Sequence, residues 1–216
     1  MPRGARFIFE NAFYHVFNRG INKNEIFLSE EDYAFFLKKL KKLLSKYDHS
    51  LYAYCLMPNH FHISIQTRKV PISKIMASLT TSYSMYLNKK YNHVGPVFQN
   101  RYKSVLIEND SYFLYLSKYI YLNPVKAGLV SDPLSYSYSS IREAIGQEPL
   151  YFLDKDIVRL IGETKGSQKE YERFILDGLS EDFSGTERLF EQEEAVVGSS
   201  GFATRSRQKY TRRKKR

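Results

Sequence analysis

The sequence contains one cysteine and no tryptophan among its 216 residues. The single cysteine, Cys55, excludes an internal disulfide and cannot form a cysteine-based metal site by itself. No apolar run approaches the roughly 20 residues that a membrane-spanning helix requires. The N-terminal stretch also lacks the continuous apolar core and small-residue cleavage site of a signal peptide. These absences predict a cytoplasmic protein without a membrane segment.

Hydrophobic residues make up 43% of the chain and aromatic residues 15%, with 18 tyrosines, which is typical of a folded globular protein. The net charge of +10 is unevenly distributed. Residues 204–216 include eight lysines and arginines and no acid, whereas 187–194 is acidic. We expect 181–216 to be a disordered tail, acidic and then basic, in which phosphate contact is a better explanation of the basic end than solubility.

Hydrophobic periodicity and turn residues predict an ordered series of elements up to Asn123-Pro124. Ser29 and the acids after it are typical of a helix N-terminus. The expected elements are a strand at 13–19, a helix from 29, strands at 51–56 and 60–66, a helix at 72–89, a strand at 102–107 and a helix at 111–122. We expect the last helix to end at Pro124, because proline disfavours helical geometry in the residue before it.

This order predicts an α+β fold of the ferredoxin-like, split βαβ type. In that fold an antiparallel sheet carries helices on one face, which leaves the other face open to a ligand. We expect one domain over 1–146, with the helix at 111–122 following its last strand. Two short helices, at 154–161 and 168–179, are expected in a helical extension over 147–180.

The stretch YCLMPNHFHISI at 54–65 places His60 and His62 one residue apart in a predicted strand. Alternate side chains of a strand project from the same face, so the two imidazoles are neighbours while Phe61 points to the opposite face. Two imidazoles at this spacing can hold one divalent cation. The competing interpretation is two ordinary polar residues on a half-exposed face, and a third ligand is needed to decide.

The helix at 111–122 carries four tyrosines. At 3.6 residues per turn Tyr112, Tyr119 and Asn123 fall nearly on one line, Tyr115 lies beside it, and Tyr121 faces the opposite way. Tyr119 and Asn123, four residues apart, can therefore act on one target, and the Asn123 amide oxygen can bind a hard cation. Packing of the tyrosines against the sheet is the simpler alternative.

His60-Phe61-His62 resembles the His-hydrophobe-His signature of HUH nucleases. The stretches AYCLMPNHFHI, FQNRYKS and KYIYLNPVKAGLV, with YHVFNRG before them and YSYSS after them, resemble single-tyrosine transposases of the insertion-sequence-200-like family. The resemblance is greatest to the REP-associated tyrosine transposases, and it covers about two thirds of the chain, from Phe13 to Arg142.

This resemblance implies that Tyr119 is the nucleophile and that His60, His62 and Asn123 hold the metal. It implies Mg²⁺, with Mn²⁺ as an alternative suited to mixed nitrogen and oxygen ligands. It also implies a transposase that nicks and rejoins single-stranded DNA, at sites flanked by hairpins, through a 5′-phosphotyrosine. The expected partner is single-stranded or hairpin DNA, and the protein is expected to act as a monomer or a homodimer.

Four basic side chains are expected to contact DNA phosphates: Arg19, Arg101, Lys103 and Lys118. His15, in the middle of a strand, is expected to be a structural histidine. The principal alternative function is a catalytically silent nucleic-acid-binding module with a ferredoxin-like sheet and a basic tail. A rolling-circle initiator or relaxase and a hydrolytic metalloenzyme are further alternatives.

Overall fold

The computed structural model describes residues 8–108, 110–162, 164–181 and 196–206, which form a five-stranded sheet and its helices. The strands are β1 (Phe13–Arg19), β2 (Ser50–Met57), β3 (His60–Gln66), β4 (Lys103–Ile107) and β5 (Val196–Val197). The helices are α1 (Glu30–Tyr47), α2 (Ile72–Lys90), α3 (Asp110–Lys126), α4 (Ile141–Ala144), α5 (Asp156–Ile161) and α6 (Lys165–Asp177), with 3₁₀ turns η1 (Ile21–Lys23), η2 (Pro133–Ser135) and η3 (Gly178–Ser180). Within the described ranges, no helix has the length and apolar character needed to cross a membrane.

The sheet has the order β2-β3-β1-β4-β5. β1 pairs antiparallel with both β3 and β4, and β3 pairs antiparallel with β2. The first four strands therefore confirm the predicted split βαβ arrangement. β5 was not predicted, and it runs parallel to β4. It is followed by a short helix at 200–206, so the expectation of a disordered tail is wrong for 196–206; the remainder of that tail, 182–195 and 207–216, lies outside the described residues.

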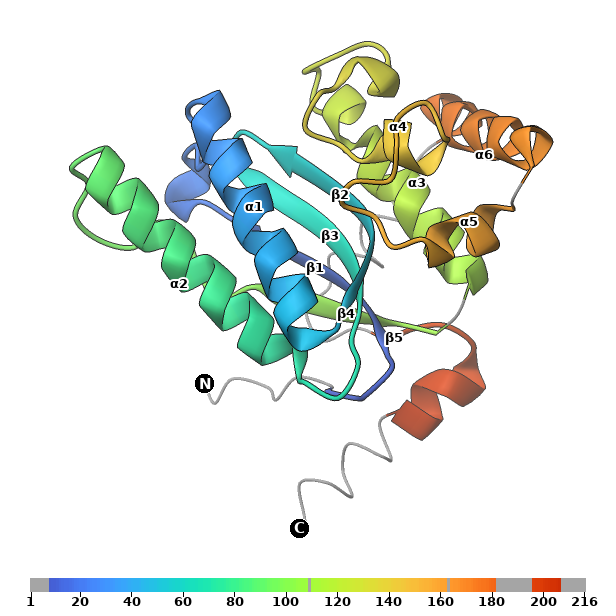
Figure 1. Cartoon of the computed structure of the whole chain (residues 1–216), viewed down its shortest axis with the longest axis horizontal. Coiled ribbons are helices and arrows are strands. Elements are labelled where there is room, and N and C mark those ends of the chain that lie inside the picture. Colours follow the sequence, from blue (N-terminus) through green and yellow to red (C-terminus); the bar gives the residue numbers. More distant parts are fainter. Residues whose placement is uncertain (1–7, 109, 163, 182–195, 207–216) are drawn as a thin grey trace.

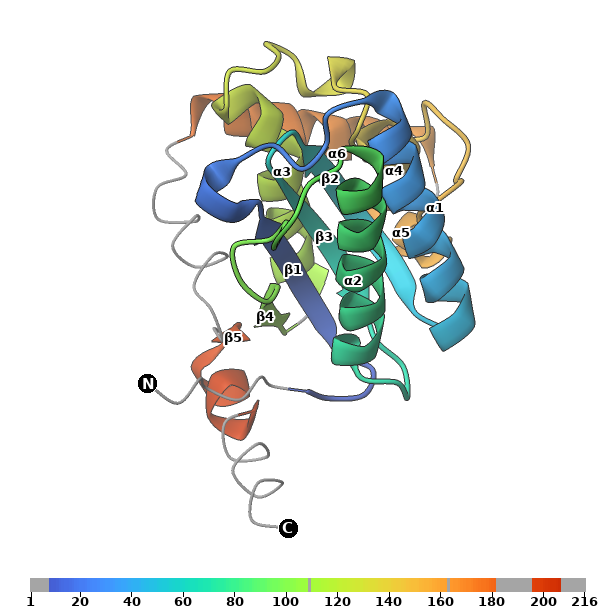
Figure 2. The same ribbon diagram turned by 90° about the vertical axis from the view of Figure 1, so that its left-hand side faces the viewer.

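Helices cover both faces of the sheet. Figures 1 and 2 show α1 and α2 on one face, and α3 with the later helices on the other. α1 and α2 share one face as predicted, whereas the other face, which was expected to be open, is partly covered by α3, which contacts β2 and β3. The physical reason lies in β2, which is buried at every residue and so needs cover on both faces.

The face beneath α1 and α2 anchors the sheet. Phe61 of β3 is fully buried and its ring lies 5.0 Å from that of Phe36 on α1. Asp32 accepts a hydrogen bond from the backbone N–H of Ser29 (3.0 Å) and pairs with Lys90 of α2 (2.8 Å), which ties the start of α1 to the end of α2. Because Phe61 points into this layer, its neighbours His60 and His62 face α3.

α3 continues through Pro124 and ends at Lys126, later than the sequence predicts. Its end is a Schellman motif: the N–H of Gly128 donates to the Val125 carbonyl (2.9 Å) and that of Leu129 to the Pro124 carbonyl (2.9 Å). Gly128 has φ +69°, the left-handed conformation that this motif requires. The motif at Gly128 therefore terminates the helix just after Lys126, and Asn123 keeps its helical position four residues after Tyr119.

Candidate active site

The predicted histidine pair lies on β3, next to the central strand of the sheet. His62 is 1% exposed and stacks against Phe17 of β1, with ring centroids 5.7 Å apart. His60, nearer the strand end, is partly exposed, and its ring centroid lies 5.0 Å from that of His62. The two rings are nearly perpendicular, at 86°. The alternation predicted from the sequence therefore places both imidazoles on the face that α3 covers.

α3 brings Tyr119 onto this pair. The Tyr119 ring lies edge-on to His62 at 5.6 Å and edge-on to His15 at 5.9 Å between centroids. Tyr119 is only 1% exposed. Of the other tyrosines on α3, Tyr115 is 55% exposed, whereas Tyr121 is buried with its hydroxyl 3.2 Å from Ser140 Oγ. The Tyr119 ring thus contacts both His15 and His62.

Each histidine of the pair is held through its Nδ1 atom. His60 Nδ1 donates to Asn59 Oδ1 at 2.5 Å, and the Asn59 amide nitrogen donates to the Lys23 carbonyl at 3.2 Å. His62 Nδ1 lies 2.9 Å from Nε2 of His15. His62 Nε2 is buried and has no hydrogen-bond partner in the part of the chain that the structure describes. A buried ring nitrogen without a partner is what a metal ligand requires before its metal binds.

Burial keeps both histidines neutral. Burial, together with the positive charge of Arg19, lowers the pKa of His60 to about 4. Burial also holds the pKa of His62 well below its usual value, with smaller contributions from His60, His15 and Lys126. Neutral imidazole is the form that coordinates a cation, so neither ring needs to lose a proton at neutral pH.

Asn123 is the predicted third ligand, and it follows Tyr119 by one turn of α3. Its amide nitrogen donates to the Tyr119 carbonyl at 2.7 Å, which leaves the amide oxygen as a donor atom for a cation. No group of three or more His, Cys, Asp or Glu side chains within the described ranges could hold a metal ion. Two neutral imidazoles and one amide oxygen nevertheless fit a divalent cation that accepts nitrogen and oxygen ligands and keeps further positions for a substrate.

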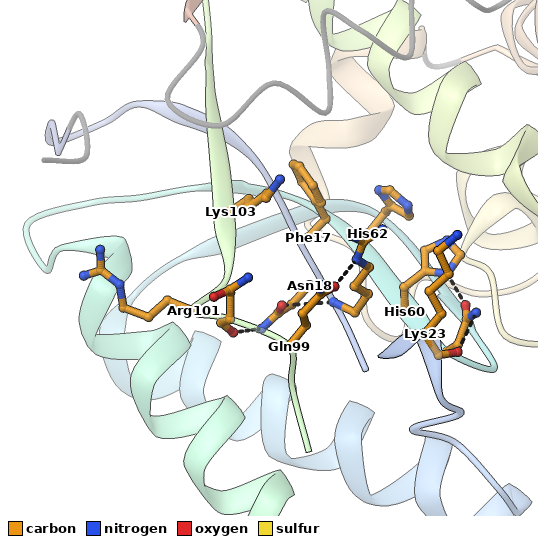
Figure 3. A pocket seen from close by; sticks show the side chains of 11 residues that line it. Phe17, Asn18, Lys23, His60, His62, Gln99, Arg101 and Lys103 are labelled. Carbon is orange, nitrogen blue, oxygen red and sulfur yellow. Dashed lines mark hydrogen bonds between the residues drawn. The ribbon is translucent and has the colours of Figure 1, made fainter. Parts of the chain in front are cut away.

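A cavity of about 290 Å³ opens beside the histidines. It is lined by Phe17, Asn18, Arg19, Lys23, Asn59, His60, His62, Gln99, Asn100, Arg101 and Lys103. Figure 3 shows Arg101 and Lys103 on one side of the histidine pair and Lys23 on the other. Three of the four predicted phosphate contacts therefore line one cavity, where their positive charges favour an anion.

Lys118, the fourth predicted phosphate contact, is placed differently. Its side chain is 2% exposed, its Nζ lies 2.6 Å from Glu181 Oε1, and it sits 4.4 Å from the ring centroid of Phe174. A buried, ion-paired lysine cannot reach DNA, so this prediction is wrong. The sequence pattern predicts a helix at 168–179 but does not reveal that α6 and η3 cover this side of α3.

Three residues near the histidines and the tyrosine were not singled out from the sequence. His15 was interpreted as structural, and Asn59 only as a turn residue. Lys126 lies two turns after Tyr119, with its Nζ 5.0 Å from that ring's centroid. The contact of Lys126 depends on the continuation of α3 past Pro124, where the helix was expected to end. The two other contacts depend on side-chain hydrogen bonds that periodicity does not reveal.

Comparison with known proteins identifies a family of transposases. The family model described as "Transposase IS200 like" matches residues 8–123. A Haemophilus influenzae Rd protein named "Putative REP-associated tyrosine transposase" is 28% identical over 125 residues, which cover 52% of this chain and 70% of that protein. A solved REP-associated tyrosine transposase bound to a REP hairpin has a TM-score of 0.60 at 17% identity, covering 73% of this chain and 93% of that one.

The structural match extends the agreement to the fold, and the family model spans β1 through the helix that carries Tyr119 and Asn123. All four antiparallel strands, both histidines of β3 and the tyrosine of α3 lie inside the matched range. The resemblance predicted from the sequence motifs is therefore confirmed, and the chain belongs to the family of IS200-like transposases.

Proposed function

We propose that this transposase cuts and rejoins single-stranded DNA through a covalent bond between Tyr119 and a 5′ phosphate, with a divalent cation bound by His60, His62 and Asn123. The observation that carries the proposal is the edge-on contact of the Tyr119 ring with His62, at 5.6 Å between centroids. It brings a candidate nucleophile and candidate metal ligands from distant parts of the sequence to one place, as phosphate chemistry requires.

In the cleavage step, Tyr119 Oη forms a bond to phosphorus while the bond from phosphorus to the 3′ oxygen breaks. The phenol loses its proton, and the departing 3′ oxygen gains one. A divalent ion, when bound, neutralises and orients the non-bridging phosphate oxygens. Because the phosphotyrosine remains a phosphodiester, a 3′ hydroxyl can attack it in the reverse reaction and restore a continuous strand without ATP.

The cavity beside the histidines supports binding of the strand next to the cleaved phosphate. Arg19 and Lys103 offer positive charge to the backbone, and Phe17 offers a ring on which an unpaired base can stack. The related structure is of a transposase bound to a REP hairpin. We infer that the substrate here is likewise single-stranded DNA beside a hairpin, with Mg²⁺ or Mn²⁺ as the cation.

The test is incubation of end-labelled single-stranded hairpin DNA with the protein and Mg²⁺ or Mn²⁺, followed by denaturing electrophoresis. We expect a covalent protein–DNA band that is absent with Tyr119→Phe, because only the phenol oxygen is removed. Tyr115→Phe, a change at an exposed position of the same helix, is the matched control and retains the band.

The alternatives give different results in the same experiment. A catalytically silent DNA-binding module binds the labelled hairpin without forming the band, and Tyr119→Phe leaves its binding unchanged. A hydrolytic metalloenzyme releases shortened DNA without an adduct. A band that survives Tyr119→Phe and is lost with Tyr115→Phe would show that the nucleophile has been misassigned.

A further inference from the structure

His15 lies at the centre of the sheet and is fully buried, yet it belongs to neither of the predicted motifs. Its Nε2 atom is 2.9 Å from Nδ1 of His62, and the planes of the two rings are inclined by only 14°. The His15 ring also meets the Tyr119 ring edge-on, with the centroids 5.9 Å apart. His15 therefore contacts both the candidate metal ligand and the candidate nucleophile.

The hydrogen bond between His15 and His62 has two possible proton arrangements, since each ring has one protonated and one unprotonated nitrogen when neutral. In one, His62 Nδ1 donates to His15 and Nε2 of His62 carries a lone pair. In the other, His15 donates, and Nε2 of His62 becomes a buried N–H group. That atom has no acceptor among the described residues, and buried donors without acceptors are rarer in proteins than buried acceptors without donors.

His60 provides an independent comparison. Its Nδ1 faces the side-chain oxygen of Asn59, an atom that only accepts, so Nδ1 must carry the proton and Nε2 the lone pair. Asn59 is itself oriented by donating to the Lys23 carbonyl. If His62 is held in the same way, both rings present Nε2 lone pairs, which is the form needed for one shared cation.

We propose that His15 is a positioning residue, which accepts the Nδ1 proton of His62 and thereby holds His62 in the tautomer whose Nε2 atom can bind a metal ion. The proposal rests on the metal-dependent function proposed above. Partners that accept a hydrogen bond from the second nitrogen of a metal-binding histidine fix both the tautomer and the orientation of the ring. Here the hydrogen-bond acceptor is a buried histidine, whereas in most metal sites it is a carboxylate or a backbone carbonyl.

The first test is independent of activity. In metal-free, ¹⁵N-labelled protein at neutral pH, long-range proton–nitrogen NMR reports which nitrogen of each imidazole is protonated. We expect His62 to be protonated at Nδ1 in the native protein, and to gain an Nε2-protonated population in His15→Phe, which keeps a ring but removes the acceptor. Native His62 protonated at Nε2 would overturn the proposal.

The second test measures Mn²⁺ binding by electron paramagnetic resonance. We expect His15→Phe to weaken binding by about 10- to 100-fold, the usual effect of removing such a partner. His15→Gln, whose amide oxygen can accept the same proton, is expected to restore part of the loss. His49→Phe is the control, because His49 is also buried but contacts the backbone N–H of Arg68, away from the site.

Thermal unfolding of each variant separates a positioning effect from a loss of structure. If His15→Phe does not fold, His15→Gln and the native NMR spectrum decide the question. Equal Mn²⁺ affinity in native protein and a folded His15→Phe variant would overturn the proposal. A native protein that binds no Mn²⁺ would instead overturn the metal-dependent function, while the nitrogen shifts would still decide the His62 tautomer.

Discussion

The two halves of the candidate site are held in place by different means. The histidines lie on β3, a strand paired on both sides, and their ring nitrogens are fixed by neighbours on the sheet or its turns. Tyr119 lies on a helix that packs on the sheet through side chains. That helix is held from outside by the C-terminal extension, where Tyr171 donates to Ser117 (2.6 Å) and Glu181 pairs with Lys118.

Substitutions in the two halves of the site should therefore have different effects. Backbone ladders make the histidine half rigid, so substitutions there should alter reactivity more than position. Ser117 and Lys118, immediately before Tyr119, contact Tyr171 and Glu181 of the C-terminal region. Substitutions at those two partners should therefore lower the stability of α3 without changing a reacting group. The following predictions test the contrast, from the largest expected effect to the smallest.

Removing both histidines of the pair should have the largest effect. We expect His60→Ala/His62→Ala to reduce the rate of covalent adduct formation by at least roughly 100-fold, because a bound cation contributes several kcal/mol to the stabilisation of a phosphate transition state. Chelation of the native protein should give a similar loss that added Mg²⁺ or Mn²⁺ reverses. Adduct formation that persists in the chelated protein would contradict this prediction.

Acid should destabilise the histidine half. His60 titrates near 6.5 when unfolded and at about 4 when folded, so between these values only the unfolded chain takes up the proton. The free energy of unfolding should therefore fall as the pH drops from 6.5 to 4, by at most roughly 3 kcal/mol for this group. Urea unfolding of metal-free protein should show a smaller fall in His60→Gln, whereas His93→Gln, at an exposed histidine, should match native protein.

Loss of the Lys118–Glu181 pair should weaken the tyrosine half. Glu181→Ala removes a carboxylate partner from a buried lysine, and we expect it to lower the free energy of unfolding by about 1–2 kcal/mol. Glu148→Ala is a matched control: Glu148 is 48% exposed, against 49% for Glu181, but its partner Arg142 is 26% exposed, against 2% for Lys118. Equal losses in the two variants would show that burial of the lysine adds nothing.

The smallest effect is expected at the Tyr171–Ser117 hydrogen bond. Tyr171→Phe should cost about 1 kcal/mol of unfolding free energy, the usual contribution of one buried hydrogen bond. Tyr151→Phe, at a side chain that is 65% exposed, should change stability by less. A double-mutant cycle with Ser117→Ala measures the coupling, which should vanish if the two hydroxyls do not interact.

The sequence predicted those parts of the site that depend on local periodicity. Strand alternation placed His60 and His62 together, and helical spacing related Tyr119 to Asn123. It could not identify the role of His15, because that role depends on which residues face one another across β1 and β3, 47 positions apart in the chain. Register between strands is a tertiary property, even though the hydrophobic pattern restricts it.

Two of the errors concern α3, and they have different origins. Lys118 was expected to be a solvent-exposed cation, but α6 and η3 cover it. The helix α3 was expected to end at Pro124, but it continues to Lys126. Packing of a segment distant in sequence buries Lys118, whereas a capping motif a few residues downstream sets the end of α3. Gly128 is the sequence signal for the end of this helix, because glycine readily adopts the left-handed conformation of the capping motif.

The proline inside α3 also has a mechanical consequence. Pro124 has no amide hydrogen, so it cannot donate to the carbonyl of Ile120, the residue that follows Tyr119. The turn between them therefore lacks one of its axial bonds, and it is the place where this helix bends most easily. A bend there would move the end of α3, with Lys126, relative to Tyr119, whose own turn is tied to the extension through Ser117 and Lys118.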